Sequence, residues 1–223
     1  MRQKFVITGT DTDIGKTVFS AGLMLALEGA GATPHYWKPV QSGVSDSIDT
    51  HTVRTLTNLG QDRFLPESYV FSESLSPHRA AELDDVHIDI DALKTALPDI
   101  NGTLIIEGAG GLMVPLTREN LLINLFKKWR IPVILCARTG LGTINHTLLS
   151  LEALWSRNIP VHGIAFIGER NVDNVKTIGQ FSETKILGTL PIIEDLSPEN
   201  LKGAFEVHFD IEDFLPKDIA IAS

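Results

Sequence analysis

The segment that most constrains this chain is residues 9–17, Gly-Thr-Asp-Thr-Asp-Ile-Gly-Lys-Thr, which follow an apolar run at 5–7. A short strand, a glycine-bearing turn and a helix opened by Gly-Lys-Thr form a cradle for phosphate, because backbone N–H groups and the positive helix end face the anion. We expect Lys16 to reach the β- and γ-phosphates and the Thr17 hydroxyl to face Mg²⁺. The usual pattern has glycine where this chain has Thr10, but the strand before and the helix after favour a phosphate loop over an ordinary turn.

Composition limits the partners of such a site. The chain has 223 residues and a formal net charge of −9. This acidic balance argues against bulk binding of nucleic acid or anionic membranes, so a bound polyanion must be held locally by Mg²⁺ and a few lysines. Cys136 is the only cysteine and lies in an apolar run, which predicts a buried thiol. No apolar stretch has the length of a membrane span, and we expect a cytoplasmic protein.

Short apolar runs alternate with helical stretches along the whole chain. The expected strands are 4–8, 35–39, 103–106, 132–137, 161–167 and 185–188. The expected helices are 18–29, 50–59, 90–97 with Asp89 as its cap, 121–129, 143–157 and 172–183, whereas 62–78 reads as irregular. The alternation predicts an α/β fold of the P-loop NTPase type, a three-layer arrangement with a mostly parallel sheet and helices on both faces. We expect residues 1–223 to form a single domain.

In sheets of this kind a ligand binds at the carboxyl ends of the strands. Unusual residues gather at those ends in five segments, which are 9–17, 38–43, 107–111, 139–146 and 168–171. This clustering indicates a composite site more strongly than any one motif does.

Polar residues at these strand ends have the chemistry of a nucleotide site. Glu107 ends an apolar strand, where P-loop enzymes place a carboxylate for Mg²⁺, usually Asp. Pro39 fixes the backbone after Lys38 and aims that ammonium as a second point charge for phosphate. Asp49 either caps the helix that it opens or supplies a second carboxylate to Mg²⁺, and Asp46 competes for the latter role.

Two further segments bear on the substrate. Asp11 and Asp13 would repel a triphosphate unless Mg²⁺ or a cationic substrate compensates, so an amine would suit them. Residues 139–146, Thr-Gly-Leu-Gly-Thr-Ile-Asn-His, open a helix after a buried strand. Their N–H groups either bind a carboxylate or form a routine connection. The remaining histidines are scattered and do not have metal-ligand spacing.

Together these residues resemble the dethiobiotin synthetase family, the ATP-dependent carboxylases of biotin synthesis. The matching segments, in the family's order, are 9–17, 38–43 (Lys-Pro-Val-Gln-Ser-Gly), 76–78 (Ser-Pro-His), 107–111 (Glu-Gly-Ala-Gly-Gly), 115–116 (Pro-Leu) and 140–146. They run from the first strand to past the middle of the chain, and the last third matches more loosely.

The resemblance implies a ligase that uses ATP as co-substrate and Mg²⁺ as cofactor. One amine of 7,8-diaminopelargonic acid (7,8-diaminononanoate) takes up CO₂ as a carbamate. The carbamate oxygen attacks the γ-phosphate of ATP and gives a carbamic-phosphoric anhydride. The second amine then closes the ureido ring and expels phosphate, which leaves dethiobiotin and ADP.

The resemblance also implies roles for individual residues. The expected catalytic residues are Lys38, Lys16 and Thr12, and the expected metal ligands are Thr17, Asp49 and Glu107. The expected nucleotide contacts are Asp13, Ile14, Gly15, Lys16, Thr17, Val18, Asp49, Glu107, Gly108, Ala109, Gly110, Gly168, Pro191, Ile192, Ile193 and, on the ribose, Glu199. The expected substrate contacts are Thr12, Ser42, Leu141, Gly142, Thr143, Ile144 and Asn145. Of these, residues 141–145 would bind the substrate carboxylate from the other subunit of a homodimer.

The chain departs from the family pattern where the adenine amino group is read. The family usually has asparagine after the 161–167 strand, but the expected place here holds Ile167 or Gly168. Either Asn171 substitutes through a shifted loop, or backbone and apolar contacts alone hold adenine. We therefore expect a weakened preference for ATP over other nucleoside triphosphates.

Two other functions remain to be compared. Nucleotide switches of the partition or septum-site type share the fold superfamily, but they carry a lysine where this chain has Asp11. They often also have a basic patch or an amphipathic tail, which the acidic balance and residues 218–223 do not support. The glutamine-dependent amide ligase of cobalamin synthesis needs a nucleophilic cysteine, and Cys136 in a buried strand is a poor candidate.

Overall fold

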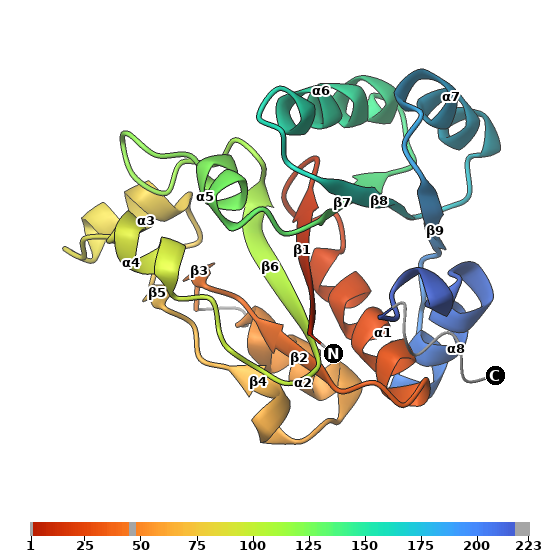
Figure 1. Cartoon of the computed structure of the whole chain (residues 1–223), viewed down its shortest axis with the longest axis horizontal. Coiled ribbons are helices and arrows are strands. Elements are labelled where there is room, and N and C mark those ends of the chain that lie inside the picture. The colour runs from red at the N-terminus through yellow and green to blue at the C-terminus, as the bar shows by residue number, and fades with distance from the viewer. Residues whose placement is uncertain (1, 45–47, 217–223) are drawn as a thin grey trace.

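The computed structural model describes residues 2–44 and 48–216. Within them the chain forms a parallel seven-stranded sheet in the order β4-β2-β6-β1-β7-β8-β9 (Figure 1). Its strands are β1 (Gln3–Gly9), β2 (Pro34–Trp37), β4 (Phe64–Leu65), β6 (Thr103–Gly111), β7 (Val133–Arg138), β8 (Val161–Ile167) and β9 (Ile186–Leu190). A separate parallel pair joins β3 (Val40–Ser42) to β5 (Tyr69–Phe71).

Helices cover both faces of the large sheet. The helices are α1 (Lys16–Gly29), α2 (Asp49–Thr57), α3 (Pro77–Leu83), α4 (Ile90–Thr95), α5 (Leu122–Trp129), α6 (Thr143–Trp155), α7 (Val172–Ser182) and α8 (Pro198–His208), with short 3₁₀ turns η1 (Gln61–Arg63) and η2 (Ile211–Asp213). Helices α1, α2 and α8 lie on one face, and α5, α6 and α7 lie on the other (Figure 1). None of the helices in the described part of the chain combines the length and hydropathy of a membrane span.

Two apolar clusters hold these layers together, one on each face of the sheet. Side chains alternate between the faces of a strand. In β6, Ile105 therefore packs with Phe19 of α1 and Phe205 of α8, whereas Ile106 packs in the cluster of Phe126 of α5. All five side chains are almost fully excluded from solvent. The same alternation decides which polar side chains at the strand ends face α1.

The predicted fold class and the alternation of elements are confirmed. Asp89 caps α4, since its side chain accepts hydrogen bonds from the backbone N–H groups of Asp91 and Ala92. Cys136 is buried as predicted, and burial raises the pKa of its thiol well above the usual range.

Three expectations about elements were wrong or incomplete. Residues 62–78 are not irregular, because β4, β5 and the start of α3 lie there. Strands of only two and three residues are too short to show an alternating pattern in the sequence, even though Phe64 and Phe71 are buried. Strand β6 continues through its glycines to Gly111, past the expected end at 106. Helix α8 was not predicted, although Ser197 followed by Pro198 is a typical helix start.

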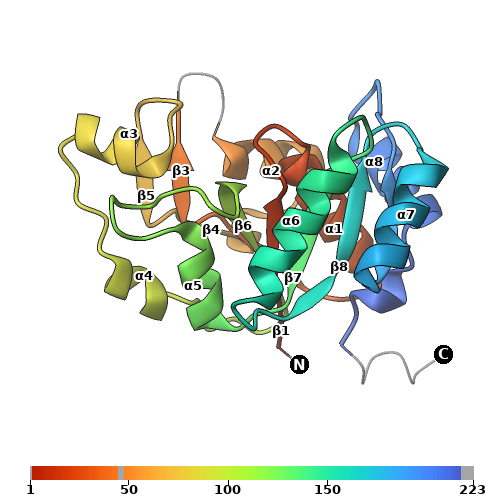
Figure 2. The same cartoon turned by 90° about the horizontal axis from the view of Figure 1, so that it is seen from above.

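The strand order brings the predicted segments to one edge of the sheet. Strand β1 pairs with β6 on one side and β7 on the other, so its loop to α1 lies at the middle of the carboxyl edge. Figure 2, a view from above, shows β3 and β5 beside the end of β6, with α6 and α7 toward the other end of the edge.

Candidate functional site

The loop between β1 and α1 is a tight turn whose glycines have packing reasons. Gly15 is the N-cap of α1 with φ 92°, and a Cβ added there would approach Ile167 Cγ2 to 2.9 Å. A Cβ on Gly9 would lie 2.9 Å from the backbone carbonyl oxygen of Asp11, so the loop folds back closely over that residue. The glycine one place earlier than in the usual pattern is therefore required by the close return of the loop.

Lys16 begins α1 and extends over the phosphate loop. Its side chain is buried, and Nζ donates a hydrogen bond to the carbonyl oxygen of Asp11 at 3.1 Å. Burial lowers the pKa of Lys16 below its ordinary value, and the nearby Glu107 carboxylate only partly opposes this shift. A buried ammonium at the start of a helix favours an anionic ligand.

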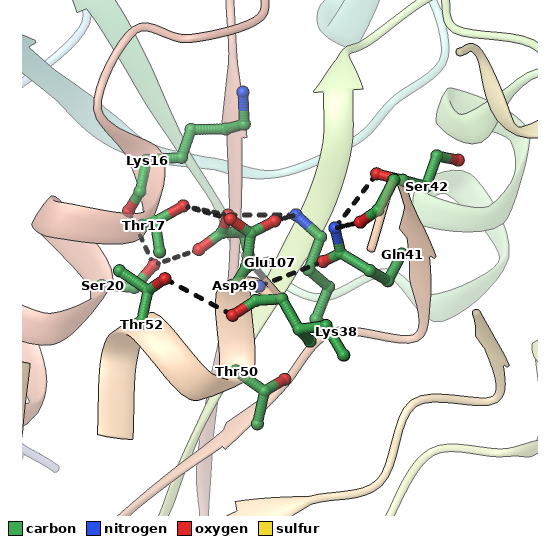
Figure 3. Close-up of polar contacts among 12 residues, drawn as sticks. Lys16, Thr17, Ser20, Lys38, Gln41, Ser42, Asp49, Thr50, Thr52 and Glu107 are labelled. Atoms are coloured by element: carbon green, nitrogen blue, oxygen red, sulfur yellow. Dashed lines mark hydrogen bonds and ion pairs between the residues drawn. The ribbon is translucent and has the colours of Figure 1, made fainter. Parts of the chain in front are cut away.

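The carboxylate of Glu107 is the centre of the polar network (Figure 3). Glu107 is 1% exposed, and each of its oxygens has two polar partners. Oε1 lies 3.0 Å from Thr17 Oγ1 and 3.2 Å from Lys38 Nζ. Oε2 lies 3.0 Å from both Ser20 Oγ and Tyr36 Oη. The carboxylate thus has one oxygen toward the loop and one toward the protein interior.

Lys38 and Asp49 complete the network. The Lys38 ammonium forms ion pairs with Asp49 and with Glu107, and Asp49 Oδ1 accepts a hydrogen bond from Thr17 Oγ1 at 3.1 Å. Burial alone would lower the pKa of Lys38, but the two carboxylates outweigh it and raise that pKa above its ordinary value. Lys38 is therefore a fully charged cation at neutral pH.

Asp49 is in the site and does not cap α2. The N-cap is Ile48, and Asp49 is the first residue of the helix. Its backbone N–H donates to Gln41 Oε1 at 3.3 Å, which ties α2 to the end of β3. Asp49 lies one position inside the helix, and its side chain faces Thr17 of the phosphate loop instead of the helix N-terminus. The capping expectation was therefore wrong. The competing residue, Asp46, lies outside the described residues.

The oxygen donors fit a magnesium ion. The Thr17 hydroxyl and the carboxylates of Asp49 and Glu107 converge within hydrogen-bond distances. Mg²⁺ is usually bound by one or two carboxylates together with substrate phosphates and water. No group of three or more His, Cys, Asp or Glu side chains in the described residues has the arrangement of a metal site, so a cation here would need phosphate or water oxygens as further ligands.

Two adjoining cavities share the Lys38–Asp49 wall. The first, of about 320 Å³, is lined by Thr12, Asp13, Ile14, Gly15, Lys16, Thr17, Val18, Lys38, Asp49, Thr52, Glu107 and Gly110. The second, of about 610 Å³, shares five of these residues and adds Gln41, Ser42, Gly43, Ser74, Leu75, Ser76, Pro77, Ala109 and Val114. Ser42 Oγ is buried there and has no hydrogen-bond partner among the described residues. The predicted phosphate residues and the predicted Thr12 and Ser42 thus lie around one continuous hollow.

The predicted nucleobase residues lie apart, at the ends of β8 and β9. Gly168 and Pro191 line a cavity of about 470 Å³, whereas the Ile192 side chain is 73% exposed. Ile193 is partly buried, and Glu199 is exposed in the first turn of α8. Gly108 lines neither neighbouring cavity; a Cβ there would lie 3.0 Å from Phe126 Cζ, so this glycine serves packing.

The Asn171 side chain is used within its own chain as a helix cap. This residue is the N-cap of α7, and its side-chain oxygen accepts from the backbone N–H of Asn174 at 3.0 Å. Of the two alternatives left by the sequence, this geometry favours backbone and apolar contacts for adenine.

The loop before α6 is exposed. Gly142, with φ 91°, is the N-cap of that helix, and the side chains of Leu141 and Asn145 are open to solvent. Thr143 is buried instead, because its hydroxyl donates to the Arg138 carbonyl oxygen, and Ile144 is half-buried. None of these residues lines the two cavities of the phosphate loop in the same chain.

Sequence reasoning missed Ser20, Tyr36 and Gln41. Their signals were present: Ser20 is one helical turn after Lys16, and Tyr36 is two residues before Lys38 on the same face of its strand. Ser20 and Tyr36 were read as parts of a helix and an apolar strand, and Gln41 as part of the segment 38–43 without a role of its own.

A strand–loop–helix phosphate cradle, a carboxylate at the neighbouring strand and a parallel sheet define a P-loop nucleotide-binding protein. The family model described as an AAA domain matches residues 3–200. The ATP-dependent dethiobiotin synthetase BioD of Brucella anthropi is 54% identical over 96% of this chain and 98% of its own length. The corresponding protein of Agrobacterium fabrum is 52% identical over 96% and 98%. The chain belongs to the dethiobiotin synthetase family, the ATP-dependent ligases of biotin biosynthesis.

Solved structures show how widely the fold is shared. The septum site-determining protein MinD of Pyrococcus horikoshii, complexed with Mg-ADP, is 13% identical with a TM-score of 0.57 over 93% of this chain and 96% of that one. An apo McdA structure is 11% identical with a TM-score of 0.53 over 92% and 91%. Likeness at this level of identity concerns the fold alone, and it does not favour a nucleotide switch over a ligase.

Proposed function

We propose that this protein carboxylates 7,8-diaminopelargonic acid and closes its ureido ring, with hydrolysis of ATP to ADP and phosphate, in one domain of 223 residues. The observation that carries the proposal is the position of Lys38. Its buried ammonium forms part of the wall common to the phosphate cavity and the neighbouring larger cavity. A cation there can act on both a nucleotide and a second substrate.

The chain's own residues would divide the work between these cavities. Lys16 and the loop N–H groups hold the β- and γ-phosphates of ATP. Thr12 and the Ser42 hydroxyl, which has no hydrogen-bond partner in the described part of the chain, hold the carbamate or the diamine in the larger cavity. Lys38 stabilises negative charge on the carbamate oxygen as it attacks the γ-phosphate and forms the carbamic-phosphoric anhydride. The exposed carboxylates of Asp11 and Asp13 suit the amines of the substrate.

Thr17, Asp49 and Glu107 would hold Mg²⁺ beside the phosphates. The ion supplies charge neutralisation for the transferring phosphoryl group. These three side chains fix where that charge is placed, because each is already restrained by another member of the network.

We further propose a homodimer in which the loop 141–145 of one subunit binds the substrate carboxylate of the other. The loop is exposed and lies outside the cavities of its own chain. Leu141, Met113 and Leu149 are large apolar side chains open to solvent, the last two beside Thr12 in a cavity of about 390 Å³. Covering such apolar surface would favour subunit association.

The reaction is tested by phosphate release from ATP with Mg²⁺ and bicarbonate, measured with and without the diamine. We expect diamine-dependent release that Lys38→Ala lowers at least about 10²-fold, while the remote Lys94→Ala leaves it unchanged. Dethiobiotin must accumulate in step with the phosphate. Release that is indifferent to the diamine would instead indicate a partition-type ATPase switch.

Mixing of inactive subunits tests the dimer. Gly142→Val should distort the loop, because a β-branched residue is strained at this positive φ. If sites are shared, a mixture of Lys38→Ala with Gly142→Val subunits should regain roughly a quarter of wild-type activity, from one intact site per mixed dimer. No recovery after verified subunit exchange would contradict the shared site.

A further inference from the structure

Tyr36 is a buried phenol that contacts a charged group of the site. It is fully excluded from solvent, and its hydroxyl donates to Glu107 Oε2 at 3.0 Å. Ser20 Oγ is equally buried and also lies 3.0 Å from that oxygen, although its single proton is shared with the Lys16 carbonyl oxygen at 2.9 Å. Neither residue lines the cavities of the phosphate loop. Their contact with the reaction is therefore indirect, through Glu107.

The sheet register explains this placement. Strand β2 pairs with β6, with Tyr36 opposite Ile105 and Trp37 opposite Ile106. Because side chains alternate along a strand, Tyr36 faces the same side as Glu107, which is the side covered by α1. Ser20 reaches that oxygen from α1, one turn after Lys16. The ring of Tyr36 packs 6.5 Å from that of Phe64, so the ring and the hydroxyl have separable functions.

The partners of Glu107 fall into two sets. Oε1 is in contact with Thr17 and Lys38, both of which line the phosphate cavity. Oε2 is in contact with Tyr36 and Ser20, which do not. The hydroxyls of Tyr36 and Ser20 both contact Oε2, and these contacts keep that oxygen from turning toward the cavity.

We propose that Tyr36 is a positioning residue which, together with Ser20, reserves Glu107 Oε2 so that the carboxylate offers a bound metal ion only Oε1. The inference rests on the proposed metal site. Mg²⁺ requires near-octahedral coordination, whereas Ca²⁺ accepts bidentate carboxylates in flexible geometry. Holding Glu107 to a single available oxygen therefore favours Mg²⁺ and disfavours Ca²⁺.

The test is the affinity for ADP, measured by calorimetry without metal, with Mg²⁺ and with Ca²⁺. Tyr36→Phe keeps the ring and removes the hydroxyl. Tyr69→Phe is the matched control, since Tyr69 is the other tyrosine of the chain and its hydroxyl accepts only the Asp89 backbone N–H in the described structure. We expect Tyr36→Phe to reduce the gain in ADP affinity from Mg²⁺ roughly tenfold and to leave metal-free ADP affinity within about twofold. The gain in ADP affinity from Ca²⁺ should fall less than the gain from Mg²⁺.

Ser20→Ala provides an independent variant of the same oxygen and should shift the Mg²⁺ to Ca²⁺ ratio in the same direction. In turnover, the Mg²⁺ concentration for half-maximal rate should rise in Tyr36→Phe while kcat at saturating Mg²⁺ changes little. Equal metal dependence in Tyr36→Phe, Ser20→Ala and Tyr69→Phe would overturn the inference while leaving the proposed function intact. If Mg²⁺ does not change the ADP affinity of the wild-type protein, the proposed metal site itself is overturned.

Discussion

The two ends of the nucleotide site are built differently. At the phosphate end, Lys38 and Glu107 are at most 5% exposed and are joined to Thr17 and Asp49 by side-chain bonds. At the base end, the Ile192 side chain is 73% exposed and Glu199 is open to solvent. The proposed phosphate end therefore consists of buried, mutually bonded charges, whereas the proposed base end is open to solvent.

This difference follows from what each end must do. Charge stabilisation in phosphoryl transfer depends on groups that are already in place, because reorganising them would add to the barrier. A base needs only a surface of the right shape unless it is read by hydrogen bonds. Substitutions should therefore affect turnover and stability at the phosphate end, and chiefly nucleotide preference at the base end.

The largest contrast is expected between Glu107→Gln and Glu199→Gln. The first replaces the charge at the centre of the network and leaves Lys38 paired with Asp49 alone. We expect kcat/KM to fall at least about 10²-fold. The free energy of unfolding should fall by about 3 kcal/mol, the low end for a broken buried pair because Asp49 remains.

Glu199→Gln makes the same chemical change at an exposed position in the first turn of α8. It should lower the free energy of unfolding by less than about 1 kcal/mol, since only the favourable interaction with the helix dipole is reduced. Urea denaturation and steady-state kinetics measure both variants. Equal losses at the two sites would show that the phosphate end is not the more highly organised one.

The sequence predicted the phosphate end well because its signals are local. The order of strand, glycine turn and Lys16-Thr17 defines that end of the fold, and alternation of apolar runs predicted the parallel sheet. Glu107 was found because it follows the apolar run 103–106, and Lys38 because it precedes Pro39 at the end of the second expected strand. The partner of Glu107, Tyr36, was not found, because a strand residue in an apolar run gives no indication of which neighbour its hydroxyl meets across 71 positions.

The base end was less predictable for a related reason. Helix α8 is stabilised mainly by packing on the sheet, as the burial of Phe205 shows. From sequence, Asn171 was a candidate base contact, and only its bond to Asn174 in the structure shows that it caps α7. Local patterns identify residue chemistry, whereas tertiary contacts decide its use.

A change of pH should affect activity through the two lysines of the phosphate end, and this effect should be smaller than that of Glu107→Gln. The pKa of Lys16 lies below its ordinary value of 10.5, whereas that of Lys38 lies above it. As pH rises, the free enzyme should lose the Lys16 charge first and bind ATP less well, while bound phosphate keeps Lys16 protonated. The pH profile of kcat/KM, which reports the free enzyme, should therefore fall at alkaline pH with a midpoint below 10.5. The pH profile of kcat should not show this fall.

Stability should respond with opposite signs at these two residues. Lys38 stabilises the fold below pH 10.5, and its contribution is lost as pH rises through its higher folded-state pKa. Lys16 binds its proton less tightly in the folded state, so its contribution rises with pH between its lowered pKa and 10.5. Denaturation of Lys16→Met and Lys38→Met between pH 7 and pH 10 separates the contributions of the two lysines to stability. An identical alkaline decrease in kcat and in kcat/KM would contradict the assignment of that decrease to Lys16.

The smallest effect is expected at the base end, in a panel of ATP, GTP, CTP and UTP. With Asn171 used as a helix cap and no asparagine at Ile167 or Gly168, shape and apolar contact alone separate the bases, and such pockets discriminate by at most roughly 10²-fold. Asn171→Ala should reduce the free energy of unfolding by about 1 kcal/mol through the lost cap, without changing the order of nucleotide preference. A preference for ATP of 10⁴-fold, as hydrogen-bond readout gives, or its loss in Asn171→Ala, would mean that the base end is as specifically organised as the phosphate end.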